Sequence, residues 1–265
     1  MAGVFDKTAE QYAQRRPGYP KEWFSMLASL TPEHKVAWDA GTGSGQAAIS
    51  VAEHYDQVIA TDVSATQLKH AAEHPKVRYL HTPISTSEDE LVSKLGGDNS
   101  IDLIISATAV HWFDLPFFYS VANRVLKKPH GIIAVWTYGI NTQHLKNSSK
   151  MLLEAVLPYI DPRTRHLLEG YKKLPFPFES VGYGSEGSPI ELSMEIEMTL
   201  VEFVKSLKTV SAFVKSEEQG VELFSDEILK EMKKEWGGTT GRRKFSSISY
   251  MLVGKPKSDQ SLASN

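Results

Sequence analysis

The chain has 265 residues, with 29 Lys or Arg and 32 Asp or Glu, so its formal net charge is 29 − 32 = −3. It contains no cysteine, which excludes disulfides, thiolate metal sites and a cysteine nucleophile. A mildly acidic chain is a poor basis for nucleic-acid binding, which needs clustered cations. The first ten residues carry an acid and no apolar run, and no stretch approaches the roughly 20 apolar residues of a spanning helix. We therefore expect a cytoplasmic protein that is not bound to a membrane.

Strands and helices are predicted to alternate through the first half of the chain. The expected strands are 36–39, 58–62, 77–81, 101–107 and 131–136, and the expected helices are 46–54, 64–73 and 116–126. The apolar density of 101–107 indicates a strand that is buried on both faces. Repetition of this kind predicts crossover units and a parallel sheet.

The second half is predicted to contain more helix and only two further strands. The expected helices are 150–157, 162–168, 200–214 and 226–236, with a loop at 173–189, a turn at 237–243 and strands at 191–198 and 245–253. No repeat and no clean linker is apparent. The pattern therefore predicts one α/β domain with an inserted helical lid.

A glycine-rich loop follows the first predicted strand, in the sequence Asp39-Ala-Gly41-Thr42-Gly43-Ser-Gly45. Alternating glycines let the backbone turn tightly and let a ligand approach main-chain N–H groups. The helix that follows carries partial positive charge at its start. Asp62 ends the second strand, where a carboxylate can accept both hydroxyls of a ribose. The loop and the acid together predict a nucleoside cofactor, and the alternative is a glycine turn with a capping aspartate.

Two cofactor classes fit this loop. Residues 43–48 read G-x-G-x-x-A, the dinucleotide fingerprint, so an NAD(P)-dependent reductase is one alternative. Asp39 argues against it, because an ionised acid at that point would face a pyrophosphate. The acid suits a ligand with a cationic end, and S-adenosylmethionine has an α-ammonium group and no phosphate. A binding module of similar build without activity is a second alternative.

The pattern D-x-G-x-G-x-G with a later strand-end acid resembles the class I S-adenosylmethionine-dependent methyltransferases. The segments 5–7 (FDK), 12–20 (YAQRRPGYP) and 109–113 (AVHWF) are similar to its small-molecule branch, which includes trans-aconitate methyltransferase and plant embryo-abundant-protein-like methyltransferases. The resemblance implies a Rossmann-like, doubly wound, seven-stranded, mostly parallel sheet with the last strand antiparallel, plus a helical lid. It implies methyl transfer to a small molecule, with S-adenosylhomocysteine as product and a carboxylate oxygen as the first candidate acceptor.

The resemblance also assigns residues to the site. The cofactor residues would be Asp39, Gly41, Thr42, Gly43, Gly45, Asp62, Val63, Ile84 and Ala107, with Tyr12 and Arg16 from an N-terminal flap. The substrate residues would be Tyr19, His111, Trp112 and Trp136. The alternatives are packing beneath the lid for His111 and Trp112, and a surface cap for the flap. His111 is the candidate base because its ordinary pKa is near 6.5, although methyl transfer to a carboxylate needs no base.

Other motifs are assigned no chemistry. His70 and His74 lie in an H-x-x-E-H pattern on a predicted helix, but Pro75 ends it and no third ligand is placed, so we expect no metal. The basic triplet at 242–244 is interpreted as a solvated loop. The segment after the fourth strand lacks the proline-rich motif of amino-methylating nucleic-acid enzymes, so we expect a small-molecule substrate and no nucleic-acid partner. The sequence leaves the oligomeric state open.

The chain is interpreted as a single methyltransferase domain, 1–265. Its expected parts are a flap and helix (1–35), a cofactor-binding core (36–136), a helical and loop lid (137–190), closing strands and helices (191–254) and a polar tail (255–265).

Overall fold

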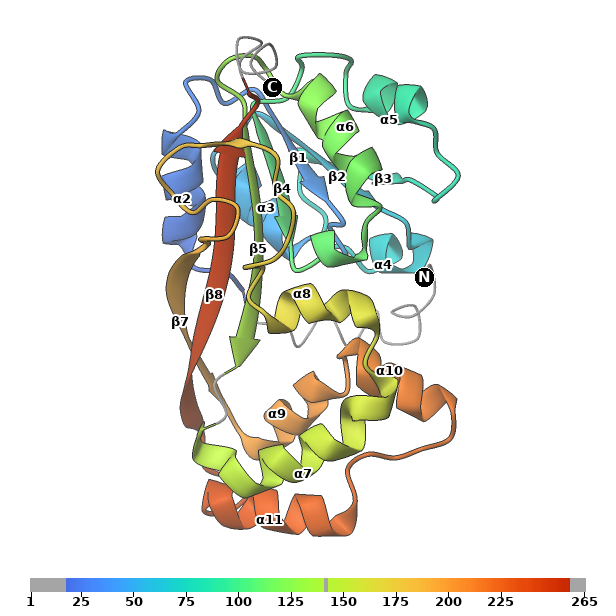
Figure 1. Cartoon of the computed structure of the whole chain (residues 1–265), viewed down its shortest axis with the longest axis vertical. Coiled ribbons are helices and arrows are strands. Elements are labelled where there is room, and N and C mark those ends of the chain that lie inside the picture. The colour runs from blue at the N-terminus through green and yellow to red at the C-terminus, as the bar shows by residue number, and fades with distance from the viewer. Residues whose placement is uncertain (1–17, 141–142, 258–265) are drawn as a thin grey trace.

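The computed structural model describes residues 18–140 and 143–257, and a mixed sheet runs through its centre (Figure 1). The strand order is β3-β2-β1-β4-β5-β8-β6, and β7 also pairs with β8. The strands are β1 (Val36–Ala40), β2 (Gln57–Asp62), β3 (Val77–His81), β4 (Leu103–Ala107), β5 (Ile132–Ile140), β6 (Glu179–Ser180), β7 (Ile190–Met198) and β8 (Arg243–Lys255).

The direction of the strands agrees with the prediction. Strands β1 to β5 pair in parallel, whereas β8 is antiparallel to β5, β6 and β7. The predicted mostly parallel, Rossmann-like sheet with an antiparallel last strand is confirmed. The described residues contain one strand more than the seven predicted. It is β6, which has two residues and lies inside the segment predicted as loop.

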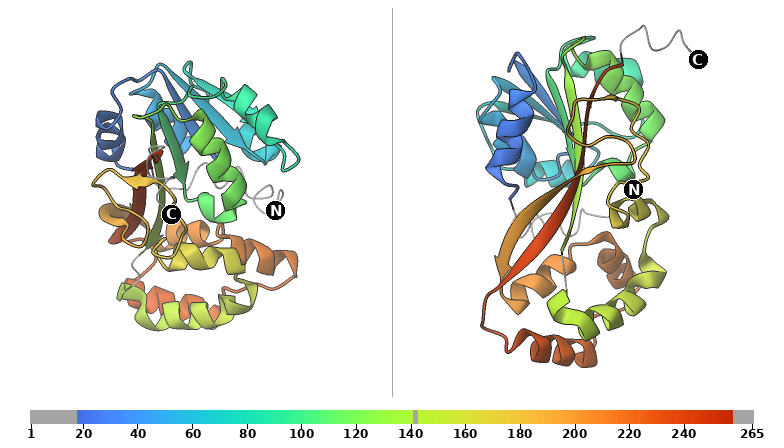
Figure 2. Two further views of the ribbon diagram at one scale, coloured as in Figure 1. Left: turned by 45° about the horizontal axis from the view of Figure 1, so that its top comes forward. Right: turned by 60° about the vertical axis from the view of Figure 1, so that its left-hand side comes forward.

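Each face of the sheet is covered by its own helices (Figure 2), and each has its own core of buried side chains. Helices α2 (Lys21–Ser29) and α3 (Gln46–Ala52) cover one face, and α5 (Glu88–Lys94) and α6 (Leu115–Val125) cover the other. Successive strand residues alternate between the two cores: Ala37 packs with the first set of helices and Trp38 with the second. This alternation follows from the period of two in a strand, and it explains why the buried strands are apolar on both sides.

The lid lies beyond the carboxyl ends of the parallel strands, where β5 and β8 extend past the rest of the sheet (Figure 1). It contains α7 (Lys146–Val156), α8 (Arg165–Leu168), α9 (Leu200–Leu207), α10 (Ser211–Glu218), α11 (Asp226–Trp236) and several 3₁₀ turns, among them η5 (Pro162–Thr164). The lid therefore extends beyond the predicted 137–190 and includes the helices of the segment 191–254. The glutamate Glu235 of α11 accepts hydrogen bonds from the backbone and hydroxyl of Ser148 in α7. Within the described ranges, no helix has the length and apolar character that crossing a membrane requires.

Three predicted helices differ in the structure. The helix expected at 200–214 is two helices, because the chain turns at Thr209, whose hydroxyl donates to the Ser206 carbonyl. Helix α4 (Ala65–Lys69) ends before 73, with His70 at its C-cap, so the H-x-x-E-H pattern does not lie on one helical face. Helix α7 begins at Lys146, four residues before the predicted start.

Candidate active site

A cavity of about 530 Å³ opens at the carboxyl ends of β1, β2 and β4. The order β2-β1-β4 makes this the point where the sheet changes winding direction, which is where ligands of open α/β sheets bind. Its volume is within the usual range for small-molecule sites. It is lined by Tyr19, Trp38, 40–43, 46–47, 61–64, Gln67, 82–84, Thr86, Leu91, 107–109, 112–114, 117–118 and Arg163.

The glycine loop forms one wall, and its conformation requires glycine. Gly41, Gly43 and Gly45 have φ angles of +71°, +57° and +87°, which L side chains rarely adopt. A Cβ on Gly41 would also lie 2.7 Å from the Cβ of Ala109, in the turn after β4. Gly41 therefore lets the loops after β1 and β4 approach each other at the cavity. Gly45 lies outside the described lining, and its missing side chain makes room for the hydroxyl of Tyr79.

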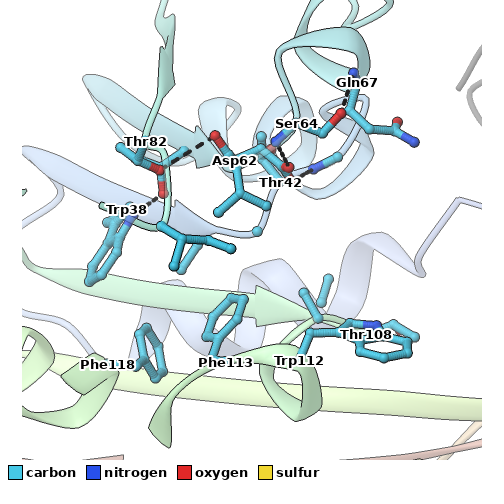
Figure 3. A pocket seen from close by; sticks show the side chains of 18 of the residues that line it. Trp38, Thr42, Asp62, Ser64, Gln67, Thr82, Thr108, Trp112, Phe113 and Phe118 are labelled. Atoms are coloured by element: carbon cyan, nitrogen blue, oxygen red, sulfur yellow. Dashed lines mark hydrogen bonds between the residues drawn. The ribbon is translucent and has the colours of Figure 1, made fainter. Parts of the chain in front are cut away.

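Asp62 stands at the end of β2 and fastens this loop. Its Oδ2 accepts a hydrogen bond from the backbone N–H of Gly43 at 2.8 Å, and its Oδ1 accepts one from the N–H of Ser64 at 2.8 Å. A carboxylate has about four lone-pair sites, so an acid that holds a loop can also serve a ligand hydroxyl. The carboxylate thus orients the loop and lines the cavity (Figure 3).

Asp39 lies in β1 directly behind the loop and is fully buried. Its Oδ2 accepts a 2.6 Å hydrogen bond from the hydroxyl of Thr42, while Oδ1 has no hydrogen-bond partner among the described residues. Burial raises the pKa of this carboxyl to about 7. The bond from Thr42 lowers the pKa, the charge of Asp62 raises it, and the backbone N–H of Ala48 lowers it. The cavity lining includes Thr42 but does not include Asp39, so Asp39 would act on a ligand through its charge from behind Thr42.

Aromatic side chains form the opposite wall, and Figure 3 shows Phe118, Phe113 and Trp112 in a row across from Asp62. The ring centroids of Phe113 and Phe118 are 5.0 Å apart, and those of Trp38 and Phe118 are 5.6 Å apart. Such a wall suits a flat ring. Nothing in the sequence marks Trp38, Phe113 or Phe118 as site residues, because apolar residues on a strand or helix have the same pattern whether they face a core or a cavity.

The structure brings some of the predicted residues together at the cavity and separates others. Those in the lining are Gly41, Thr42, Gly43, Asp62, Val63, Ile84, Ala107, Tyr19 and Trp112. The described lining does not include Asp39, Gly45, His111 or Trp136. The predictions for Tyr12 and Arg16 lie outside the described residues.

The structure does not support His111 as a base. Only 4% of the side chain is exposed, and Nδ1 lies 3.0 Å from the hydroxyl of Tyr171, within hydrogen-bond distance. Burial, and then the nearby His166 and Arg163, lower its pKa to about 3. Trp136 is likewise fully buried, and its ring meets that of Tyr19 edge-on at 5.4 Å. Trp136 supports Tyr19 from behind the cavity wall.

Thr108 is a lining residue that the sequence analysis missed, and its backbone is strained. It has a φ of +55°, an unusual value for a β-branched residue. Its N–H donates to the Trp136 carbonyl at 2.7 Å, and its hydroxyl lies 3.4 Å from that of Tyr19. Strain of this kind persists where the surroundings impose it, and it concentrates at functional sites.

Comparison with known proteins points to one class. Residues 38–135 match the family described as methyltransferase domain. A protein of Dictyostelium discoideum named as a methyltransferase is 27% identical over 261 residues, which are 95% of this chain and 94% of that protein. A solved structure from Anaeromyxobacter dehalogenans, titled as a type II methyltransferase, superposes with a TM-score of 0.74 at 28% identity and covers 91% of this chain and 97% of that one.

A more distant relative carries a more specific name. The tRNA 5-carboxymethoxyuridine methyltransferase of Escherichia coli is 29% identical over 147 residues, which are 51% of this chain and 56% of that protein. Together these likenesses support a class I methyltransferase, and the family implies dependence on S-adenosylmethionine. They do not single out the trans-aconitate or plant branch.

We predict that Gly41→Ala weakens binding of S-adenosylhomocysteine by at least about tenfold, measured by calorimetry, because the new Cβ pushes the loops apart. Gly97→Ala is the matched control, since Gly97 also has a positive φ (+94°) but a Cβ there would meet nothing within 4 Å. Both variants carry backbone strain of about 1–3 kcal/mol, because alanine at a positive φ is disfavoured. Equal affinity of the two variants would contradict the role assigned to Gly41.

Proposed function

We propose that this protein transfers a methyl group from S-adenosylmethionine to a small molecule, with a carboxylate oxygen as the acceptor. The observation that carries the proposal is the meeting of three features at one edge of the sheet. They are a glycine loop that lines the cavity, a strand-end carboxylate that also lines it, and a buried carboxylate directly behind the loop.

The residues present fit the cofactor. Asp62 would accept hydrogen bonds from the ribose hydroxyls, and Thr42 and Gly43 would lie along the methionine part. The charge of Asp39 would offset the α-ammonium group from behind Thr42. Val63 and Ile84, 40% and 74% exposed, offer apolar surface in the same cavity for an adenine ring.

The chemistry requires little of the protein beyond binding and alignment. When bound, S-adenosylmethionine supplies a methyl group whose bond to sulfur breaks, with the electron pair returning to sulfur, as the bond to the acceptor forms. The protein's own residues hold the ligands in line and exclude water, and such alignment is worth about 7–11 kcal/mol in favourable intramolecular cases. An ionised carboxylate has no proton to lose, which agrees with a cavity whose described lining does not include His111.

The alternatives fit less well. A nicotinamide dinucleotide would bring its pyrophosphate to the loop in front of Asp39 and beside Asp62, where like charges repel. The distant relative named for tRNA modification raises a nucleic-acid acceptor as an alternative. However, the described residues that line the cavity include one cation, Arg163, which is a weak basis for holding a polyanion.

The direct test is to incubate the protein with methyl-labelled S-adenosylmethionine and a metabolite extract. We expect label in small molecules that mild alkali releases as methanol, because methyl esters hydrolyse under conditions that N-methyl and C-methyl groups survive. Label that is stable in alkali would contradict the carboxylate acceptor but would still support methyl transfer. Binding of cofactor without any transfer would instead identify a binding module without activity.

A second prediction concerns Asp62. We expect Asp62→Asn to weaken the binding of S-adenosylhomocysteine by about 10- to 100-fold, since hydrogen bonds to a charged acceptor contribute about 1.5–3 kcal/mol each. Asp114→Asn is the control: Asp114 also lines the cavity, and Asn caps α6 as well as Asp does. That variant should stay within about threefold of the parent. Calorimetry measures the affinity of both variants. An Asp62→Asn protein that binds S-adenosylhomocysteine as tightly as the parent would show that the ribose lies elsewhere.

A third prediction concerns pH. In the free protein Asp39 titrates near pH 7, and a cationic ligand binds the ionised form better. Affinity for S-adenosylhomocysteine should therefore rise about tenfold between pH 5.5 and pH 7, with release of a proton on binding near pH 6. Calorimetry in buffers of different ionisation enthalpy measures both. The dependence should disappear in Asp39→Asn, and a parent affinity that is constant over this range would refute the role of Asp39.

A further inference from the structure

We propose that Arg163 binds the carboxylate of the methyl acceptor, and that the acceptor is a monocarboxylic acid with an apolar body. This rests on the proposed function.

Arg163 lies in η5, in the lid, and is one of the residues that line the cavity. Its guanidinium carbon is 5.1 Å from the ring centroid of Trp112, which lies in η2 (Val110–Trp112) after β4. Stacking on an aromatic ring is a position that Arg occupies well and Lys poorly. The arginine thus joins the lid to the loop at the cavity wall.

Asp161 fixes the guanidinium in one orientation. Nε donates to Oδ1 at 3.0 Å and Nη2 donates to Oδ2 at 2.8 Å, and the backbone N–H of Arg163 donates to Oδ1 at 2.9 Å. These bonds lower the pKa of Asp161 to about 2, so the pair stays ionised. The third nitrogen, Nη1, has no hydrogen bond to a described residue, and the side chain is 43% exposed.

The charge arrangement favours a single carboxylate. Among the described lining residues Arg163 is the cation, and the anions are Asp62 and Asp114. Because Asp161 balances the charge of Arg163, the pair attracts anions weakly at long range. What remains is a directed, charge-assisted hydrogen bond from Nη1 at close range, which a carboxylate accepts more strongly than a neutral amide does.

The surroundings of Arg163 favour an apolar body. Trp112, Phe113 and Phe117 line the same cavity, and Phe117 is 36% exposed. Tyr19 adds an aromatic ring beside Thr108. A ligand that places its carboxylate on Arg163 would therefore extend along rings, where burial of apolar surface stabilises the complex.

The test uses octanoate and cinnamate as probes, with octanamide and cinnamamide as neutral counterparts, in calorimetry with saturating S-adenosylhomocysteine. The parent should bind each acid at least about tenfold more tightly than its amide. Arg163→Gln should lose this preference, and Arg163→Lys should recover only part of it. Arg165→Gln is the control, because Arg165 is a neighbouring lid arginine, 75% exposed and paired with Glu169. It should keep the parent's preference.

The affinity for S-adenosylhomocysteine separates the two proposals. Arg163→Gln should bind it within about threefold of the parent. A large loss would overturn the inference and assign Arg163 to the carboxylate of the cofactor. Parent protein that binds S-adenosylhomocysteine but shows no preference for the acids would overturn the inference alone. Parent protein that does not bind S-adenosylhomocysteine would overturn the proposed function as well.

Discussion

The burial of the Asp39 carboxylate is the constraint on which the arrangement of the site depends. Asp39 is paired in register with Ala60 of β2 on one side and Ile105 of β4 on the other, so it sits in the middle of the parallel sheet. A carboxylate there loses its hydration, and the Thr42 hydroxyl replaces it on one oxygen only. Placing a cation in the cavity beside Thr42 would offset part of that loss, so the fold favours such a ligand before any direct contact with it.

The two sides of the cavity differ in origin. The glycine loop and Asp62 come from neighbouring strands and hold each other through the bond from Gly43 to Asp62. The other side comes from the turn after β4 and from the lid, where Thr108 is strained and Arg163 stacks on Trp112. In the proposed function the first side recognises the cofactor, which is the same in every reaction of the class. The second side selects the acceptor.

The sequence predicted the fold well where local signals agree with packing. The helix at 226–236 was predicted to the residue: Ser225 caps its start, and Gly237, with a φ of +74°, ends it. Helix 200–214 was predicted as one because the apolar period continues past Thr209, where the chain turns. Helix α5 was missed, although Ser87 and Glu90 have the spacing of a capping box and the Ser87 hydroxyl accepts from the Glu90 N–H.

Apart from Tyr19, which the family resemblance supplied, the predicted residues that line the cavity follow the ends of strands. Gly41, Gly43 and Asp62 can be recognised from the sequence, because glycines and an acid at the ends of parallel strands indicate a ligand site. His111 stands next to Trp112 in the chain, yet the first is buried against Tyr171 and the second lines the cavity. Position in the sequence does not give the direction of a side chain. Arg163 comes from a distant segment with no motif, so only the tertiary structure brings it to the cavity.

Strand β5 continues from the core into the lid, and this continuity affects which parts of the chain can change in evolution. β5 pairs with β8 from Ile133 to Ile140, so one ladder of hydrogen bonds runs from the core to the lid. The family match stops at residue 135, inside that strand. Helices inserted between β5 and β8 can change length and composition while the ladder keeps its register. Under the proposed function, a lineage could thus exchange its methyl acceptor and keep the same methyl donor.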